Sequence, residues 1–278
     1  MKTRSFRSSL FLALVLLFLY LPVITVVLFS FNASTSRTPI EMTGFTLRWY
    51  GELFQDTRGF GAALLVSLRV AVLSVAMASL IGTLGAIGMA GRAVKKSALL
   101  GAEETLVTLP ILIPEIILGI AFMLLFQLLG VPMGEMALVL AHTTFCIPYV
   151  YMTVKSRLVG MDPALSEAAR DLGATPRRVL LDITLPLVRP AILSGAFLSL
   201  AMSLDDFVIS FFISGTDTTL PIRIYSSVKA GVSPQVNALC TLMMLAVFVL
   251  VGVSQYVLAA KRHKDNKRRI TTSKTIGR

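Results

Sequence analysis

Two adjacent aspartates, Asp205 and Asp206, lie in an apolar run that extends from Pro190 to Ser214. A carboxylate in hydrocarbon is costly, so an acidic residue in a membrane segment usually has a function or a fixed partner. Such a pair can bind a cation, or it can belong to an intramembrane aspartyl protease. The protease requires a Gly-x-Gly-Asp pattern, and no Gly-x-Gly precedes either aspartate. We therefore expect no catalytic residue in this chain. The pair either lines a cation pathway, which we favour because intramembrane acids are usually functional, or has a structural role in which one aspartate caps a neighbouring helix or pairs with a fixed cation at a subunit interface.

The two aspartates are not expected to play the same part. Neighbouring residues in a helix point about 100° apart, so both carboxylates cannot line one face equally. Asp206 shares its helical face with Ser203 and Ser210, whereas the face of Asp205 is more apolar. The pattern weakly favours Asp206 as the carboxylate exposed to a pathway, with Asp205 held by a protein partner.

Three further polar residues fall within apolar segments. Glu115 follows Pro114, and it can either extend the acidic lining or accept hydrogen bonds from backbone N–H groups freed by a helix break. His142 has no Cys or His neighbours, which is typical of an interhelical hydrogen bond and not of a metal ligand, so we predict no metal site. Arg69 is expected to snorkel or to pair with an acid, with the two aspartates as candidates.

The composition shows which elements must position these residues. The chain has 278 residues, of which 55% are hydrophobic and 15% charged, and its mean hydropathy is +0.79. The sequence contains long apolar runs, and runs of about 20 residues are typical of helices that cross about 30 Å of hydrocarbon. We therefore predict an all-α polytopic membrane protein with six transmembrane helices. They are predicted at about Leu10–Ser30, Ala62–Ala90, Leu106–Leu129, Met136–Val154, Pro190–Ser214 and Ala238–Ala260.

The distribution of Lys and Arg predicts the orientation. With a cytoplasmic N-terminus, the inside segments hold 20 of these residues and the outside loops hold five. Positive charge accumulates on the cytoplasmic side of membrane proteins, so both termini are predicted to be cytoplasmic. The predicted order is a cytoplasmic start (1–9), a first helix with a periplasmic loop (10–61), the main transmembrane domain (62–260) and a basic cytoplasmic tail (261–278). The tail can touch anionic lipid. The accumulation of positive charge on the cytoplasmic side explains the net charge of +11 without nucleic-acid binding.

A long inside loop at about residues 155–189 is predicted to contain two short helices. Asp162 and Thr175 are N-cap residues, each followed by a proline at the first helical position, and Gly173 lies between the helices. The second helix is amphipathic. Such a pair can dock a partner protein or lie in the lipid headgroups, and the pattern alone does not separate the two.

The spacing within that loop points to a family. Glu167-Ala168-Ala169 is followed at fixed distances by Gly173, Ile183 and Leu185-Pro186. This pattern resembles the EAA loop of bacterial ABC importer permeases, which implies the MetI-like type I fold with cytoplasmic EAA coupling helices. The resemblance also implies that Glu167, Ala168, Ala169, Asp171 and Gly173 couple the chain to an ATPase. We expect Pro186 to end the coupling element before the fifth span.

A finer resemblance extends along most of the chain. The segments "RWYGELFQD", "AHTTFCIPYVYMTVKSRL", "EAARDLGATP", "SLDDFVISFFISG" and "LPIRIYSSVKAGVSPQVNAL" are similar to the second permease of spermidine/putrescine ABC importers of the bacterial inner membrane. The resemblance implies three partners: a homologous first permease in a heterodimer, two copies of a cytoplasmic ABC ATPase, and a periplasmic polyamine-binding protein. No GxxxxGK[ST] loop occurs here, so ATP and Mg²⁺ are expected on the partner ATPase, with no cofactor in this chain.

A polyamine is a flexible polycation with methylene spacers. Its path needs carboxylates for the ammonium groups and aromatic faces for cation–π contact. We therefore predict a substrate pathway with Asp205, Asp206, Glu115 and Tyr149, and we assign Met202 and Phe207 to ordinary packing.

Three alternatives compete with the polyamine permease. The nearest is a permease for another solute such as iron, thiamine or phosphate. An anionic cargo would favour basic residues at mid-membrane, whereas the three acids there support a cation. A rhomboid protease needs Gly-x-Ser-Gly, and Ser194-Gly195 has Ile192 at the first position. A channel would have no use for an EAA loop.

Overall fold

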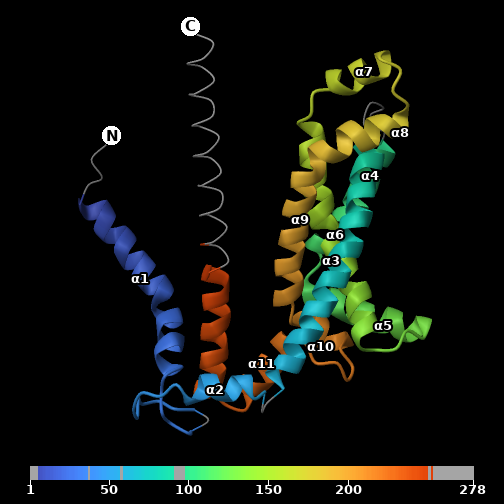
Figure 1. Cartoon of the computed structure of the whole chain (residues 1–278). Helices are drawn as coiled ribbons and strands as arrows, with labels where there is room; N and C mark the ends of the chain where they lie inside the picture. Colours follow the sequence, from blue (N-terminus) through green and yellow to red (C-terminus); the bar gives the residue numbers. More distant parts are fainter. Residues whose placement is uncertain (1–5, 37, 57–58, 91–97, 250–251, 253–278) are drawn as a thin grey trace. The chain divides into compact units, whose positions relative to one another are not determined.

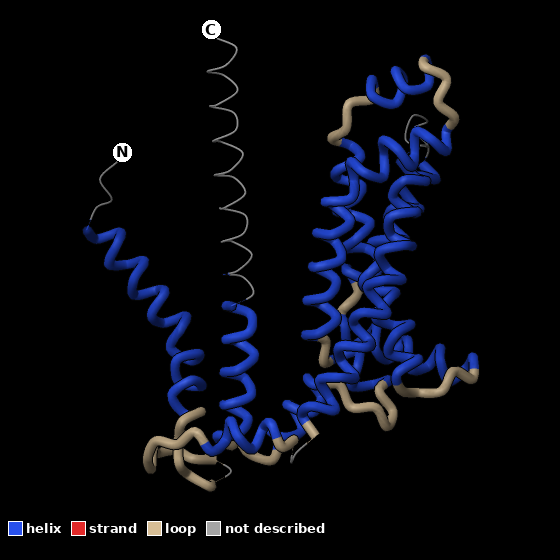
Figure 2. The backbone as a smooth tube through the Cα atoms, viewed as in Figure 1, coloured by secondary structure: helices blue, strands red, loops and turns tan. Residues whose placement is uncertain are grey.

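The computed structural model describes residues 6–36, 38–56, 59–90, 98–249 and 252, and the described residues fold into helices and loops without a strand (Figure 2). The chain forms two compact units. One unit contains residues 59–225, and the other joins residues 1–58 to residues 226–278.

Three long helices form the core of the 59–225 unit. Helices α3 (Phe60–Ala90), α6 (Glu135–Val159) and α9 (Leu185–Asp205) pack side by side along the unit (Figure 1). Small residues such as Gly82 let these helices approach closely. A Cβ on Gly82 would lie 3.0 Å from the carbonyl oxygen of Ile147 in α6, whereas one on Gly88 would meet nothing within 4 Å.

The packing of α6 against α9 is also tight, and it carries a testable consequence. A Cβ on Gly195 would lie 2.9 Å from the Cα of Val150 and would overlap Thr153. We expect Gly195→Val to push the helices apart and to lower the free energy of unfolding by about 1–3 kcal/mol, the usual cost of overpacking. The thermal midpoint of the purified complex measures this loss of stability. Gly88→Ala is the matched control, and equal midpoints for the two variants would contradict the packing.

The predicted third span is two helices, not one. Helix α4 (Ala98–Leu112) and helix α5 (Glu115–Leu129) meet at an angle of 104°. Pro110 lies inside α4 without ending it, while Pro114 takes an extended conformation with ψ of 131°. Of these two prolines, only Pro114 redirects the chain.

The predicted fifth span is also broken. Helix α9 ends at Asp205, and α10 (Val208–Ile213) begins three residues later. Asp206 has ψ of 118°, which is extended, and it follows the last helical residue. The helical-face comparison of the two aspartates is therefore wrong, because they do not share one helix.

The EAA loop keeps its predicted caps but not its predicted end. Helix α7 (Ala164–Asp171) begins where Ala164 N–H donates to the Asp162 carboxylate at 3.0 Å, and Thr175 accepts from Arg178 N–H at 3.4 Å in α8 (Pro176–Arg178). From α8 the chain continues as a π-helix (Val179–Thr184) into α9. Pro186 does not end the coupling element, because the wider π-helical turn just before α9 accommodates a residue that lacks an N–H group.

The other unit contains α1 (Phe6–Phe29), α2 (Arg48–Phe54) and a helix at Pro234–Val249, and α11 (Leu220–Lys229) crosses the unit boundary. Trp49 is buried here, and its indole N–H donates to the Asn32 carbonyl at 2.7 Å. The ring therefore packs inside the loop that follows α1.

The apolar surfaces are those of a multi-pass membrane protein. Four described helices are long and apolar enough to cross a bilayer: α1, α3, α6 and the continuous helix Pro176–Asp205. The bent pair α4–α5 is a fifth candidate when counted as one span. The predicted sixth span, Ala238–Ala260, is described at residues 238–249 and 252, which are helical, and the basic tail at 261–278 lies outside the described residues.

Candidate functional site

A pocket of about 170 Å³ lies where the two broken helices meet in the 59–225 unit. The break between α4 and α5 forms one side, the break between α9 and α10 forms another, and α6 contributes aromatic rings. All four residues predicted for the substrate pathway line this pocket. The lining residues are Pro110, Ile111, Ile113, Glu115, Leu118, Phe145, Tyr149, Met202, Asp205, Asp206, Phe207, Val208 and Ile209.

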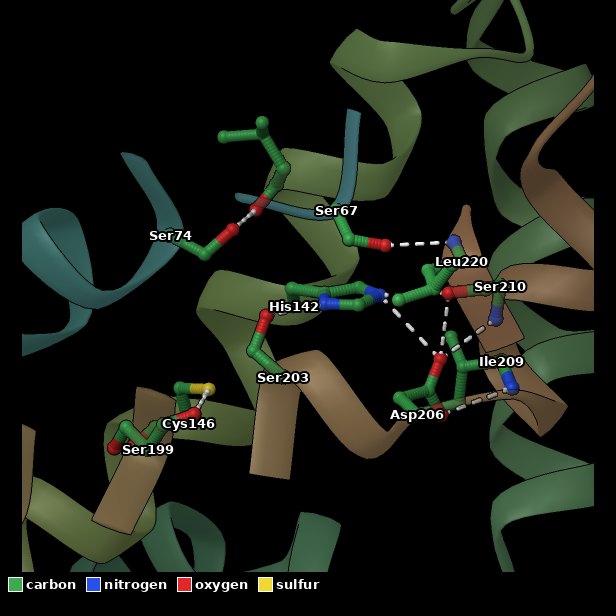
Figure 3. A network of polar contacts seen from close by, with 11 residues as sticks. Ser67, Ser74, His142, Cys146, Ser199, Ser203, Asp206, Ile209, Ser210 and Leu220 are labelled. Carbon is green, nitrogen blue, oxygen red and sulfur yellow. Dashed lines mark hydrogen bonds and ion pairs between the residues drawn. The ribbon is translucent and has the colours of Figure 1, made fainter. Parts of the chain in front are cut away.

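The carboxylate of Asp206 is buried and already bonded. It accepts hydrogen bonds from the backbone N–H of Ile209 at 3.2 Å and from the backbone N–H of Ser210 at 2.9 Å. The Ser210 hydroxyl donates to it at 2.7 Å, and Nε2 of His142 lies 3.4 Å away (Figure 3). The carboxylate thereby satisfies two N–H groups at the start of α10, which have no partner within that helix. The Asp206 charge is therefore committed to the protein.

Asp205 and Glu115 are exposed, and neither has a hydrogen bond or ion pair with another described residue. The weak preference for Asp206 as the exposed aspartate is therefore reversed. Glu115 stands in the first turn of α5, and α5 has no side-chain cap. Of the two alternatives for Glu115, the structure favours the acidic lining. Two uncompensated carboxylates thus face one small pocket.

The helix ends around the pocket add to its negative character. Helices α4 and α9 both end there, at Leu112 and Asp205. The last carbonyl groups of a helix lack intrahelical partners and carry a partial negative charge. Helix α5 presents its positive end at the same break, but Glu115 lies in that first turn. The balance of charges around the pocket favours a cation.

Rings and a thioether supply the rest of the lining. Phe145 and Tyr149 come from α6, and Phe207 comes from the break, where its ring centroid lies 4.6 Å from that of Tyr225. Sequence reasoning assigned Met202 and Phe207 to packing and so missed their place at the pocket. Phe207 stands directly after the two aspartates, and that adjacency was the available signal. Such faces suit ammonium groups and methylene chains.

Two other polar predictions have clear outcomes. His142 is 1% exposed, and its ring nitrogens contact Ser203 and Ser210, so the prediction of interhelical hydrogen bonding is confirmed. Arg69 pairs with an acid, as one alternative held, but the acid is Glu135 at 3.5 Å and not an aspartate of the pocket. Among the described residues, no group of three or more His, Cys, Asp or Glu side chains could hold a metal ion.

The residues expected to couple the chain to an ATPase lie together on and after α7. The helix buries none of its residues, and Leu172 beside it is 89% exposed. Figure 1 shows α7 at one end of the unit, away from α5 and α10. Gly173 has φ of +84°, a left-handed conformation that favours glycine, and it lets the chain turn into α8.

This arrangement is that of a multi-pass membrane protein, and the comparisons with known proteins show its family. A family model described as "binding-protein-dependent transport system inner membrane component" matches residues 78–264. The chain belongs to this family. The chain resembles a bacterial ABC transporter for the acidic polysaccharide alginate (TM-score 0.69, 15% identity, 92% of this chain and 99% of that one). It also resembles the MetNI methionine ABC transporter (TM-score 0.60, 20% identity, 76% and 97%). At these identities the likeness shows the fold alone.

Named relatives share much more sequence. The chain is 38% identical to the spermidine/putrescine transport system permease protein PotC of Haemophilus influenzae, over 94% of this chain and 100% of the relative. It is 40% identical to the putrescine transport system permease protein PotI of Escherichia coli K12, over 87% of each chain. It is 39% identical to PotC of the same strain, over 92% and 95%.

Proposed function

We propose that this chain is a permease subunit of an ATP-driven importer that moves polyamines such as putrescine and spermidine across the bacterial inner membrane. The observation that carries the proposal is the pocket in which Asp205 and Glu115 present uncompensated carboxylates beside aromatic rings. The relatives named for spermidine and putrescine transport support the same cargo. An anionic cargo would need basic lining, and the pocket has none among its lining residues.

The proposal includes partners and an orientation. A homologous first permease completes a heterodimer, two ATPase subunits bind ATP and Mg²⁺, and a periplasmic binding protein delivers the polyamine. The EAA loop with Glu167, Ala168, Ala169, Asp171 and Gly173 faces the cytoplasm and contacts the ATPase, and both termini lie on that side. The exposed apolar surface beside the EAA sequence, at Leu172, suits such a contact.

The pocket offers a way to move a polycation without holding it tightly. Asp205 and Glu115 replace part of the water around the ammonium groups, while Tyr149 and Phe207 cover methylenes. Discontinuous helices near the membrane centre are a recurring way to build such sites. The inside-negative potential favours entry by about 2.3 kcal/mol per charge per 100 mV. The carboxylates therefore need only offset desolvation, and ATP binding by the partner drives the change of access.

ATPase activity of the complete reconstituted complex tests this function. Binding protein loaded with putrescine, cadaverine, spermidine or spermine is compared with the same protein offered thiamine or ferric iron. We expect stimulation of at least about fivefold by one or more polyamines, because the loaded binding protein selects the ATP-closed state. Stimulation by none of the polyamines would overturn the substrate assignment. Stimulation by thiamine or iron alone would favour the other solute class.

A further inference from the structure

The break between α9 and α10 is held by a residue from a different helix. His142 lies in α6, and its imidazole is almost fully buried. Its Nδ1 is 2.7 Å from the hydroxyl of Ser203, which lies in α9 before the break. Its Nε2 is 3.0 Å from the hydroxyl of Ser210, which lies in α10 after the break. One side chain therefore contacts both sides of the interruption (Figure 3).

The polar atoms around the imidazole form a continuous chain of donors and acceptors. The Ser203 hydroxyl can donate to Nδ1, and Nε2–H can donate to the Ser210 hydroxyl. Ser210 in turn donates to the Asp206 carboxylate at 2.7 Å. This arrangement uses both ring nitrogens of His142 and both hydroxyls. A buried network in which every polar group is hydrogen-bonded favours a single geometry, because moving one group leaves the buried donors and acceptors of the others without partners.

The consequence of this network concerns the residue beside it. Asp206 is bonded within the network, and Asp205 is the last residue of α9, immediately before it. With Ser203 and Asp206 both fixed, the backbone of Asp205 has little freedom between them. We infer that His142 is a positioning residue, which clamps the α9–α10 break so that Asp205 faces the pocket. The inference rests on the proposed function only for the role of Asp205 toward cargo.

The test measures where position 205 points. Asp205→Cys is introduced with Cys146→Ala and Cys240→Ala, and the full complex in membrane vesicles is treated with a positively charged methanethiosulfonate reagent. We expect His142→Phe, which fills the space without hydrogen bonds, to slow the modification of residue 205 at least about fivefold. His142→Gln, which keeps a donor near the Nε2 position, should restore much of the rate.

Two controls separate the clamp from general damage. Thr144→Ala changes an exposed residue of α6 whose hydroxyl donates to the Leu140 carbonyl of the same helix, and it should leave the rate unchanged. Met152→Cys places a thiol at another exposed position of α6, and this thiol should react at the same rate with and without His142→Phe, because a local clamp does not alter that site. If His142→Phe does not assemble, Ser203→Ala removes one contact and should slow the reaction at residue 205 about twofold or more.

An equal or faster reaction at residue 205 in His142→Phe, or in Ser203→Ala where that variant replaces it, would overturn the clamp. The readout uses no cargo, so the two proposals can fail separately. If polyamines do not stimulate the wild-type complex but His142→Phe slows the modification of residue 205, the proposed function alone is contradicted. If polyamine transport is normal but His142→Phe does not change the modification rate at residue 205, the positioning role of His142 alone is contradicted.

Discussion

Asp205→Asn is expected to lower polyamine uptake by the assembled transporter at least about tenfold, because a hydrogen bond to a charged group contributes about 1.5–3 kcal/mol. Asp205 is exposed in the pocket, and no described residue compensates its charge. The substitution keeps the size of the side chain and removes only the charge. Uptake of labelled polyamine into proteoliposomes that contain the full complex measures the effect, and the thermal midpoint should stay close to that of the wild type.

Asp206→Asn provides the contrast. Its carboxylate accepts from Ile209 N–H, Ser210 N–H and the Ser210 hydroxyl, so an amide nitrogen placed there would face donors. Leaving buried donors unsatisfied costs about 1–3 kcal/mol, and we expect a lower thermal midpoint and a lower yield of complex. Uptake per folded complex should fall less than in Asp205→Asn. The reverse order of the two defects would assign the pathway to Asp206 and contradict the structure.

Gly173→Pro is expected to separate transport from ATP hydrolysis or to prevent the ATPase from copurifying. Gly173 has φ of +84°, while a proline ring holds φ near −65°. The Gly173 N–H also donates to the Arg170 carbonyl at 2.9 Å, a bond that proline cannot make. The path from α7 to α8 would therefore change, and with it the surface offered to the ATPase. Copurification of the ATPase, and uptake per ATP hydrolysed, are the measurements.

Gly173→Asn is the matched control for that loop. Asparagine tolerates the left-handed conformation better than other residues with a side chain, and it keeps the N–H donor. We expect the Asn variant to retain most of the coupling. If Gly173→Pro copurified with the ATPase and transported at the wild-type rate, the docking role of α7 would be wrong.

Local signals in the sequence predicted the two caps and the turn of the EAA loop, but not its end. Asp162 and Thr175 cap their helices because the capping contact is made within three residues. The left-handed turn at Gly173 likewise depends on one residue type. The π-helix between α8 and α9 was not predicted, because a proline such as Pro186 usually ends a helix unless the turn before it is wider.

Long-range contacts explain what the sequence did not reveal. The break after Asp205 has no proline or glycine to announce it, and it is held by His142, which lies 61 residues before Ser203. The hydropathy of Pro190–Ser214 predicts one uninterrupted span, so the buried and the exposed aspartate were assigned in the wrong order. Pro114 did signal the other break, and the predicted acids Glu115 and Asp205 came together as pocket residues.

Transport by the double variant Asp205→Asn/Glu115→Gln tests the central claim most directly, because it removes both uncompensated carboxylates of the pocket at once. Labelled putrescine and spermidine uptake is measured in proteoliposomes that hold the full complex and loaded binding protein. Uptake per folded complex should fall to about a hundredth of the wild-type rate or lower, the combined loss of two charged interactions. Uptake at the wild-type rate would show that the cargo does not use this pocket.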